Sequence, residues 1–226
     1  MKRGLILGMI LVLSFLTACS MIGRSCPDGE IEWVDTLMLN DVNYTGEDEG
    51  FSNVDNLKEG SKIGEVEFML ADNACSNHRL RNGDAAFLPV GTEVFEIVGY
   101  DPTFRVFANG RLYQVRENEN ADTIRDLYDI EGRVQKLSLE STYDGRQLLD
   151  FTQDEMDAFI EDFLTLDYVG FHQIYERIST SNSTFLRIHL DDGTSFRISY
   201  WLDENALNPG AYGTERMKTI IEKNVR

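Results

Sequence analysis

Apolar and polar residues alternate over several short stretches in the first half of the chain. A period of two is typical of β-strands that bury one face. It predicts strands at residues 31–39, 65–70 and 93–100 and a hairpin at 104–115. Residues 30–118 are therefore expected to form an antiparallel β module. A charged, loop-like segment, with one helical turn at most, follows at 116–130.

The turn of the first hairpin is predicted at Asn109-Gly110. A two-residue type I′ turn needs positive φ at both central positions, and Asn-Gly supplies it. This turn pairs Ala108 with Arg111 and Val106 with Tyr113, so that apolar residues of the two strands face each other.

A helix is the strongest local prediction in the second half. Thr152 and Glu155 have the spacing of a capping box, in which each side chain accepts from the other residue's backbone N–H. Apolar residues then recur at helical spacing. They are Met156, Phe159, Ile160, Phe163 and Leu164.

The other predicted elements of this half are a strand at 134–141, an extended segment at 171–178, a hairpin at 184–202 and a last helix from Thr214. The order β-α-β-β-β-α predicts an α+β module over residues 119–226, with helices packed on an antiparallel sheet.

The turn of the second hairpin is predicted to have three residues, Asp191-Asp192-Gly193, with Gly193 left-handed. This turn pairs Ile188 with Phe196, whereas a two-residue turn would set Ile188 opposite Arg197. A type I turn with a G1 bulge therefore fits the apolar pattern better.

Four cationic or aromatic residues then share the face opposite the apolar pairs, and we call them the strip: Arg187, His189, Arg197 and Trp201. Such a strip can bind a cell-wall polymer, a carboxylate or an acidic segment of a partner. The alternative is that the arginines pair with acidic residues of neighbouring elements. Because Arg187 lies opposite Arg197, an anion is expected between them in either case.

The chain begins like a secreted protein. A basic start, Met1-Lys2-Arg3, precedes an apolar run at 4–16, which is shorter than the roughly 20 residues of a membrane-spanning helix. The tetrapeptide Leu16-Thr17-Ala18-Cys19 resembles the lipobox of bacterial lipoproteins.

In that family the cysteine receives a diacylglycerol group and the preceding peptide is removed. The resemblance implies that residues 1–18 are a signal peptide, that Cys19 is lipidated, and that 19–29 form a short stem. Two acyl chains suffice for stable anchoring at the extracytoplasmic face of the cell membrane.

The composition is strongly acidic, with a formal net charge of −18. Removal of residues 1–18 takes away two basic residues and no acidic one, so the mature charge becomes −20. Such a surface repels nucleic acid and anionic lipid headgroups, so no nucleic acid partner is expected. The acidic stretch at 46–50 lacks the ligand spacing of a calcium-binding EF-hand loop and is predicted to be a solvated turn.

Two cysteines remain besides Cys19. Cys26 and Cys75 can form a disulfide in an extracytoplasmic setting or stay as two free thiols, and both alternatives remain open.

The region from residue 82 onward also resembles small lipoproteins of unknown function from Gram-positive bacteria. The resemblance lies in three runs, at 82–92, 98–102 and 192–196. It implies a location but no activity.

Motifs for catalysis or cofactor binding are absent from the sequence. There is no G-x-S-x-G, H-E-x-x-H or phosphate-binding loop, and His78, His172 and His189 lie in different elements. No cofactor, metal or catalytic residue is therefore predicted, and Cys75 with His78 is only a weak nucleophile–base candidate.

Two functions remain open at this point. The first is a non-enzymatic, membrane-anchored module that binds or scaffolds a cell-wall polymer or a protein partner. The second is a cell-envelope hydrolase or a ligand-sensing accessory protein. A deep cleft with convergent carboxylates would favour a hydrolase, and an open sheet face would favour binding.

Overall fold

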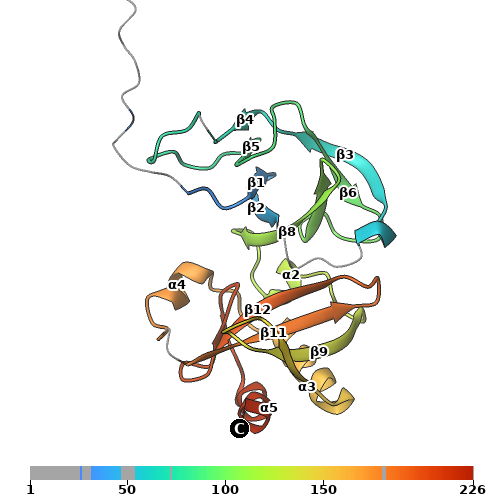
Figure 1. The fold of residues 1–226 in the computed structure, drawn as a ribbon, viewed down its shortest axis with the longest axis vertical. Helices are drawn as coiled ribbons and strands as arrows, with labels where there is room; N and C mark the ends of the chain where they lie inside the picture. Colours follow the sequence, from blue (N-terminus) through green and yellow to red (C-terminus); the bar gives the residue numbers. More distant parts are fainter. Residues whose placement is uncertain (1–25, 27–31, 47–53, 72, 180–181, 226) are drawn as a thin grey trace, which may run out of the picture. The chain divides into compact units, whose positions relative to one another are not determined.

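The computed structural model describes residues 26, 32–46, 54–71, 73–179 and 182–225 (Figure 1). The predicted signal peptide, the lipobox and the stem apart from Cys26 lie outside the described residues. So do residues 47–50 of the predicted acidic turn. No helix of the described part is both long and apolar enough to cross a membrane.

The chain divides into two compact units. The first comprises residues 1–32 and 74–79, and the second comprises 33–73 and 80–226. In the first unit Cys26 and Cys75 form a disulfide, with their Cα atoms 5.0 Å apart. Of the two alternatives for these cysteines, the structure therefore contains the disulfide.

The second unit contains two sheets. The larger has eight strands among the described residues, in the order β3-β6-β7-β8-β2-β1-β5-β4. Its strands are β1 (Thr36–Leu39), β2 (Val42–Gly46), β3 (Glu59–Glu65), β4 (Phe68–Met69), β5 (Asp84–Ala85), β6 (Glu93–Ile97), β7 (Arg105–Ala108) and β8 (Arg111–Asn118). Every pairing in it is antiparallel except that of β4 with β5.

The smaller sheet has six strands among the described residues, in the order β10-β9-β11-β12-β13-β14, all paired antiparallel. Its strands are β9 (Val134–Glu140), β10 (Gln147–Asp150), β11 (Ser183–Leu190), β12 (Ser195–Trp201), β13 (Ala206–Leu207) and β14 (Ala211–Tyr212). The helical elements are η1 (Val54–Asn56), α2 (Ile124–Leu127), α3 (Gln153–Thr165), α4 (Phe171–Tyr175) and α5 (Glu215–Val225). The predicted α+β class is confirmed. The predicted module boundary near residue 118 stays a prediction.

Both predicted hairpin registers are confirmed. Ala108 pairs with Arg111 across Asn109 and Gly110, whose φ angles are 53° and 70°. Ile188 pairs with Phe196 in the other hairpin.

The segment at 171–178 is not extended as predicted. Residues 171–175 form helix α4, in which Phe171 and Ile174 are three positions apart and so lie on one helical face. Ile174 is fully buried there.

Strand β3 was missed in the sequence, and the predicted strand at 65–70 is reduced to β4. β3 is an edge strand with two glycines and mostly exposed side chains, so its backbone pairing with β6 leaves no apolar alternation to detect. Val66, before β4, and Leu70, after it, are nevertheless buried.

Five further strands were missed because they are short or follow unexpected turns. They are β2, β5, β10, β13 and β14. In addition, β8 continues to Asn118 into the segment predicted to be a loop. From β9 onward the order is therefore β-β-α-α-β-β-β-β-α, not β-α-β-β-β-α, and the helical turn α2 precedes it.

One continuous hydrophobic core contains side chains from both sheets and from helices α2, α3 and α5. Phe104 of the larger-sheet region lies edge-on to Tyr128 and Phe196, with ring centroids 5.6 and 6.1 Å apart. Phe196 belongs to β12, so these rings connect the two sheets.

A buried arginine also connects the two sheets. Arg105 is fully buried and donates to Gln114 Oε1 at 2.9 and 2.7 Å within the larger sheet. It also donates to Thr194 Oγ1 at 2.8 Å beside the turn of the β11–β12 hairpin. Its guanidinium lies 4.5 Å from the ring centroid of Phe104. Asp192 Oδ2 lies 3.9 Å from the same guanidinium, so the buried cation is held by a carboxylate, by polar groups and by aromatic rings.

Candidate functional site

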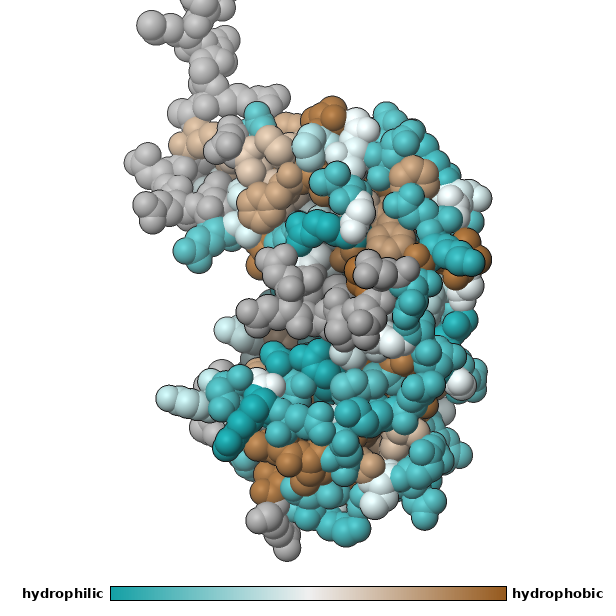
Figure 2. Space-filling view, turned by 45° about the vertical axis from the view of Figure 1, so that its right-hand side comes forward, coloured by the Kyte–Doolittle hydropathy of each residue, from teal (hydrophilic) through white to brown (hydrophobic). Residues whose placement is uncertain are grey.

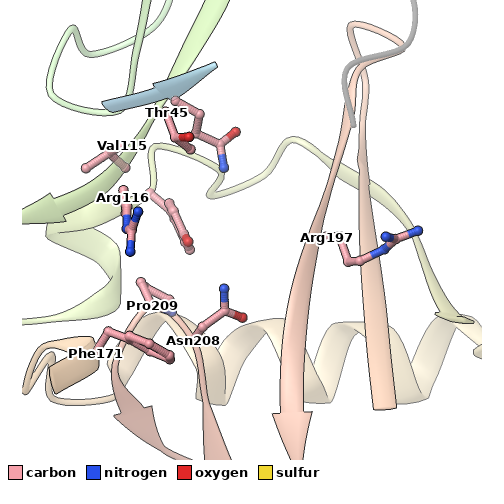
Figure 3. Close-up of a pocket in the computed structure, with 9 residues that line it drawn as sticks. Thr45, Val115, Arg116, Phe171, Arg197, Asn208 and Pro209 are labelled. Carbon is pink, nitrogen blue, oxygen red and sulfur yellow. The ribbon is translucent and has the colours of Figure 1, made fainter. Parts of the chain in front are cut away.

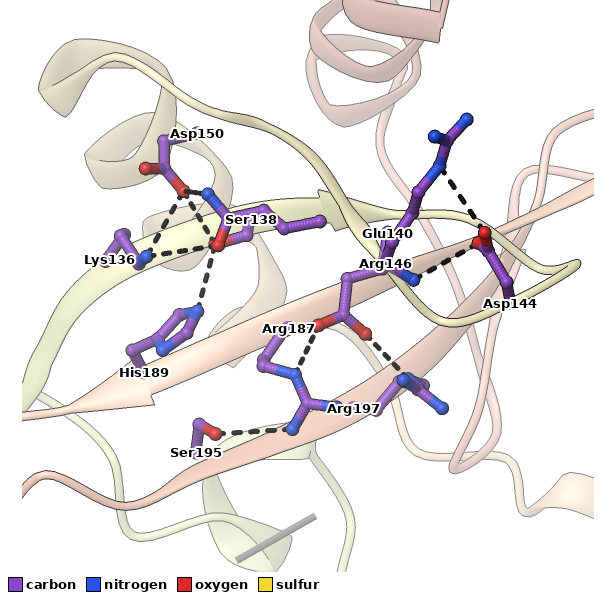
Figure 4. Close-up of polar contacts among 11 residues, drawn as sticks. Lys136, Ser138, Glu140, Asp144, Arg146, Asp150, Arg187, His189, Ser195 and Arg197 are labelled. Carbon is purple, nitrogen blue, oxygen red and sulfur yellow. Dashed lines mark hydrogen bonds and ion pairs between the residues drawn. The ribbon is translucent and has the colours of Figure 1, made fainter. Parts of the chain in front are cut away.

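The strip lies where strand alternation predicts, and Figure 4 shows what surrounds it. Arg187 pairs with Arg197 across β11 and β12. Glu140 of β9 is buried between them: it accepts from Arg187 Nε, and from Arg197 Nε at 2.7 Å (Figure 4). The anion expected between the two arginines is therefore supplied by the protein itself.

Glu140 is held in its charged form. Burial alone would raise the pKa of Glu140, but the hydrogen bonds and charges of Arg187 and Arg197 outweigh it and keep that pKa below its ordinary value. The group of three residues is therefore an internal ion-pair network.

His189 belongs to a second polar group beside the first. Its Nε2 lies 2.9 Å from Ser138 Oγ, which lies 2.8 Å from Asp150 Oδ1 (Figure 4). Lys136 Nζ lies 3.3 Å from the same Asp150 oxygen. Burial lowers the pKa of His189 to about 4, and the positive charges of Lys136 and Arg187 add to the effect.

The direction of these hydrogen bonds excludes a catalytic triad. Burial tends to raise the pKa of Asp150, but hydrogen bonds from Ser138 and Lys136 hold it below its ordinary value, so Asp150 only accepts. Ser138 has one hydroxyl proton and gives it to Asp150, so the neutral His189 must donate from Nε2. His189 therefore cannot act as a base toward Ser138, which is also fully buried.

Trp201 is on the same face but is covered. Its ring centroid lies 6.1 Å from that of Phe171 in α4, and it packs in a small apolar cluster with Ile174 and Ala206. The structure thus brings together Arg187, His189 and Arg197, and leaves Trp201 under helix α4.

The remaining sequence candidates do not converge. Cys75 is in the disulfide, and the backbone N–H of His78 donates to the Cys75 carbonyl at 2.9 Å. His172 is exposed on α4, 3.8 Å from Glu176. Among the described residues no group of three or more His, Cys, Asp or Glu side chains is arranged to hold a metal ion.

A cleft that sequence reasoning missed lies between the two sheets of the second unit. It has a volume of about 270 Å³. Figure 3 shows the residues that line it: Thr45, Gln114, Val115, Arg116, Tyr128, Phe171, Arg197, Asn208 and Pro209. The side chain of Arg197 points away from the others, while that of Arg116 lies between Val115 and Pro209 (Figure 3).

Arg116 reaches the cleft because of a β-bulge. In the pairing of β2 with β8, Asn43 lies opposite Glu117 and Tyr44 opposite Val115, so Arg116 is the extra residue. A bulge redirects the side chain of the extra residue out of the regular alternation. Arg116 is exposed and forms no ion pair or hydrogen bond with any other described residue.

Two amide side chains in the cleft have fixed orientations. Gln114 Oε1 accepts from Arg105, which can only donate, so the Gln114 NH₂ group is turned away from Arg105. Asn208 Oδ1 accepts from the backbone N–H of Ser199, so its NH₂ group is likewise the free end. The signal available in sequence was Arg116 alone. The partners that orient the two amides are nearby, Arg105 across the β7–β8 hairpin and Ser199 in β12, but no sequence motif marks either contact.

A second cleft, of about 370 Å³, is rich in carboxylates. Each carboxylate has a local partner: Asp101 accepts from Thr103 Oγ1 at 2.7 Å, Asp129 from the backbone N–H of Asp101 at 3.0 Å, and Glu131 from Arg125. Asp126 is the acidic member of the capping box of α2. These carboxylates serve local turns and the start of a helix.

Comparisons with family models, curated proteins and solved structures found no match to this chain.

Proposed function

We propose that the protein is an extracytoplasmic lipoprotein, anchored through Cys19, that binds a small ligand in the cleft between its two sheets. The observation that carries the binding proposal is the cleft lining. Arg116 and the NH₂ groups of Gln114 and Asn208 can all donate to a ligand there.

A non-enzymatic function is favoured by the chemistry of the same lining. Hydrolysis needs a general base or an activated nucleophile close to the reacting bond. The nine described lining residues contain no carboxylate, imidazole, thiol or amine. The carboxylates of the second cleft have structural partners, so the hydrolase alternative has less support than binding.

The location is proposed from two features. The lipobox resemblance at 16–19 follows directly on an apolar run, as a lipoprotein signal requires. The Cys26–Cys75 disulfide supports the same location, because structural disulfides persist in oxidising compartments outside the cytosol. A lipid anchor is also the attachment that suits a protein with a net charge of −18, since electrostatics oppose binding to anionic lipids.

The anchor is tested by detergent phase partition of the protein expressed in a bacterial host that lipidates its lipoproteins. The native chain is expected in the detergent phase, and Cys19→Ala in the aqueous phase, because two acyl chains confer stable membrane affinity. Cys26→Ala is the matched control and is expected to stay in the detergent phase. A native chain in the aqueous phase would refute the anchor.

Native mass spectrometry of the same detergent-phase protein tests the binding proposal. We expect a small molecule to copurify with the folded chain. Gln114→Glu, which places a negative oxygen in the cleft, is expected to change its occupancy. A ligand that is retained unchanged in this variant would place the binding site elsewhere.

A further inference from the structure

We infer that the cleft recognises a carboxylate carried on a small apolar group. This inference rests on the proposed binding function and names the class of its ligand. Two sources share this chemistry: a free organic acid, and the C-terminus of a peptide.

The first step is that the guanidinium and both amides of the lining present donors; of the other polar side chains, the Thr45 hydroxyl donates to the Asp35 carbonyl and Tyr128 carries a hydroxyl that can donate or accept. An arginine side chain can only donate, and the orientations of Gln114 and Asn208 leave their NH₂ groups as the free ends. These three donors favour a ligand that supplies acceptors. A carboxylate, with two acceptor oxygens, fits a guanidinium and neighbouring amides.

The second step concerns charge. Arg116 is exposed, and within the described residues it has no anion of its own. A cation without an internal partner favours an anionic ligand over a neutral one. The net charge of −18 opposes anions of high charge, so a singly charged carboxylate is favoured over a phosphate dianion.

The third step concerns the walls and the volume. Val115, Tyr128, Phe171 and Pro209 supply apolar surface beside the donors. A volume of about 270 Å³ is at the small end of ligand sites, which start at roughly 300 Å³. The carboxylate is therefore attached to a group the size of one aromatic ring or one or two small residues.

The experiment is a ligand-observed NMR titration of full-length protein in non-ionic detergent micelles, with empty micelles as the blank. Phenylacetate represents a free acid and acetyl-alanyl-alanine a peptide C-terminus. Their neutral amides have the same shape and serve as matched ligands. We expect at least one carboxylate to bind with a Kd on the order of 1 mM or tighter, and its amide to bind at least about tenfold more weakly.

Three variants test the donors. Arg116→Gln removes the cation. Gln114→Glu and Asn208→Asp keep the oxygen that accepts from Arg105 or Ser199 and replace only the NH₂ group. Each variant is expected to weaken carboxylate binding about tenfold or more, because a charge-assisted hydrogen bond is lost or a like charge is added. Thermal unfolding is expected to remain close to that of the native chain.

Arg81→Gln is the control, because Arg81 is exposed, carries the same charge and does not line the cleft. It is expected to bind like the native chain. Binding of only one carboxylate identifies the source, and binding of both supports the shared chemistry. No binding of either carboxylate at about 10 mM, equal binding of the amides, or unchanged binding by the three variants would overturn the inference.

Failure of this inference can be distinguished from failure of the proposed function. A neutral molecule that copurifies in the cleft would leave the binding function in place and refute the carboxylate. Carboxylate binding by a chain that stays in the aqueous phase would keep the inference and refute the anchor.

Discussion

At the scale of single residues, the burial of two charged side chains, Glu140 and Arg105, depends on partners in other parts of the chain. Glu140 is the last residue of β9, where apolar and polar residues alternate. Only the pairing of β9 with β11 brings it to Arg187. Arg105 follows Phe104 in a hairpin whose register was predicted correctly. Its burial depends on Thr194, 89 positions away.

Replacement of Glu140 by Gln should destabilise the fold by about 2–3 kcal/mol, because it leaves two opposed arginines without their shared anion. Chemical denaturation at neutral pH measures this loss. Glu161→Gln is the matched control, since Glu161 is a well exposed partner of Arg216 and should change stability by less than about 0.5 kcal/mol. An equal effect of both substitutions would contradict the internal role of Glu140.

The same network has a pH dependence of known sign. The folded-state pKa of Glu140 lies below its ordinary value of 4.5, so its stabilisation is present above pH 4.5 and is lost as pH falls through the folded-state pKa. The stability difference between the native chain and Glu140→Gln should therefore shrink on acidification below pH 4.5. A constant difference over this range would count against the ion pairs.

At the scale of elements, the sequence predicted a helix where a capping box marks its start, and a turn where only one loop length fits the apolar pattern. Helix α3 begins where Thr152 and Glu155 form the expected capping box. The Asp191–Gly193 turn was chosen correctly because only one loop length keeps the apolar residues paired. In contrast, α4 has no side-chain cap, so its first residue is not indicated by the sequence.

Thr152→Ala should cost about 1 kcal/mol, because Thr152 Oγ1 accepts from the otherwise unpaired N–H of Glu155. Thermal or urea unfolding measures the change. Thr165→Ala, at the other end of the same helix, is the control: its hydroxyl only donates to the Asp162 carbonyl, so little change is expected. A larger loss at Thr165 than at Thr152 would show that the cap is not what stabilises this helix.

At the scale of the whole molecule, the two sheets of the second unit share one hydrophobic core. On the face seen in Figure 2, hydrophilic residues predominate and hydrophobic residues form only small patches. This agrees with a chain that carries 39 acidic residues. Inside, the rings of Phe104, Tyr128 and Phe196 and the buried Arg105 join the two sheets.

A shared core predicts that both sheets unfold together. The chain has two tryptophans, Trp33 just before β1 of the larger sheet and Trp201 in β12 of the smaller one. In the variant Trp201→Phe, the fluorescence of Trp33 reports on the larger sheet. In the variant Trp33→Phe, the fluorescence of Trp201 reports on the smaller sheet. Its fluorescence midpoint in urea should coincide with the midpoint by circular dichroism for each variant. Separate midpoints would mean that the sheets unfold as independent modules.

The sequence alone determined the α+β class, both hairpin registers, helix α3 and the start of α5, since these depend on residues within a few positions of one another. It also indicated the strip on β11 and β12. Only the tertiary structure decided that Glu140 serves as the strip's anion, that Arg105 is buried, and that Arg116, Gln114 and Asn208 line one cleft. The physical reason is that hydrogen-bond partners and burial depend on which strands become neighbours. Edge strands, bulges and contacts between sheets produce no periodic pattern of apolar and polar residues in the sequence.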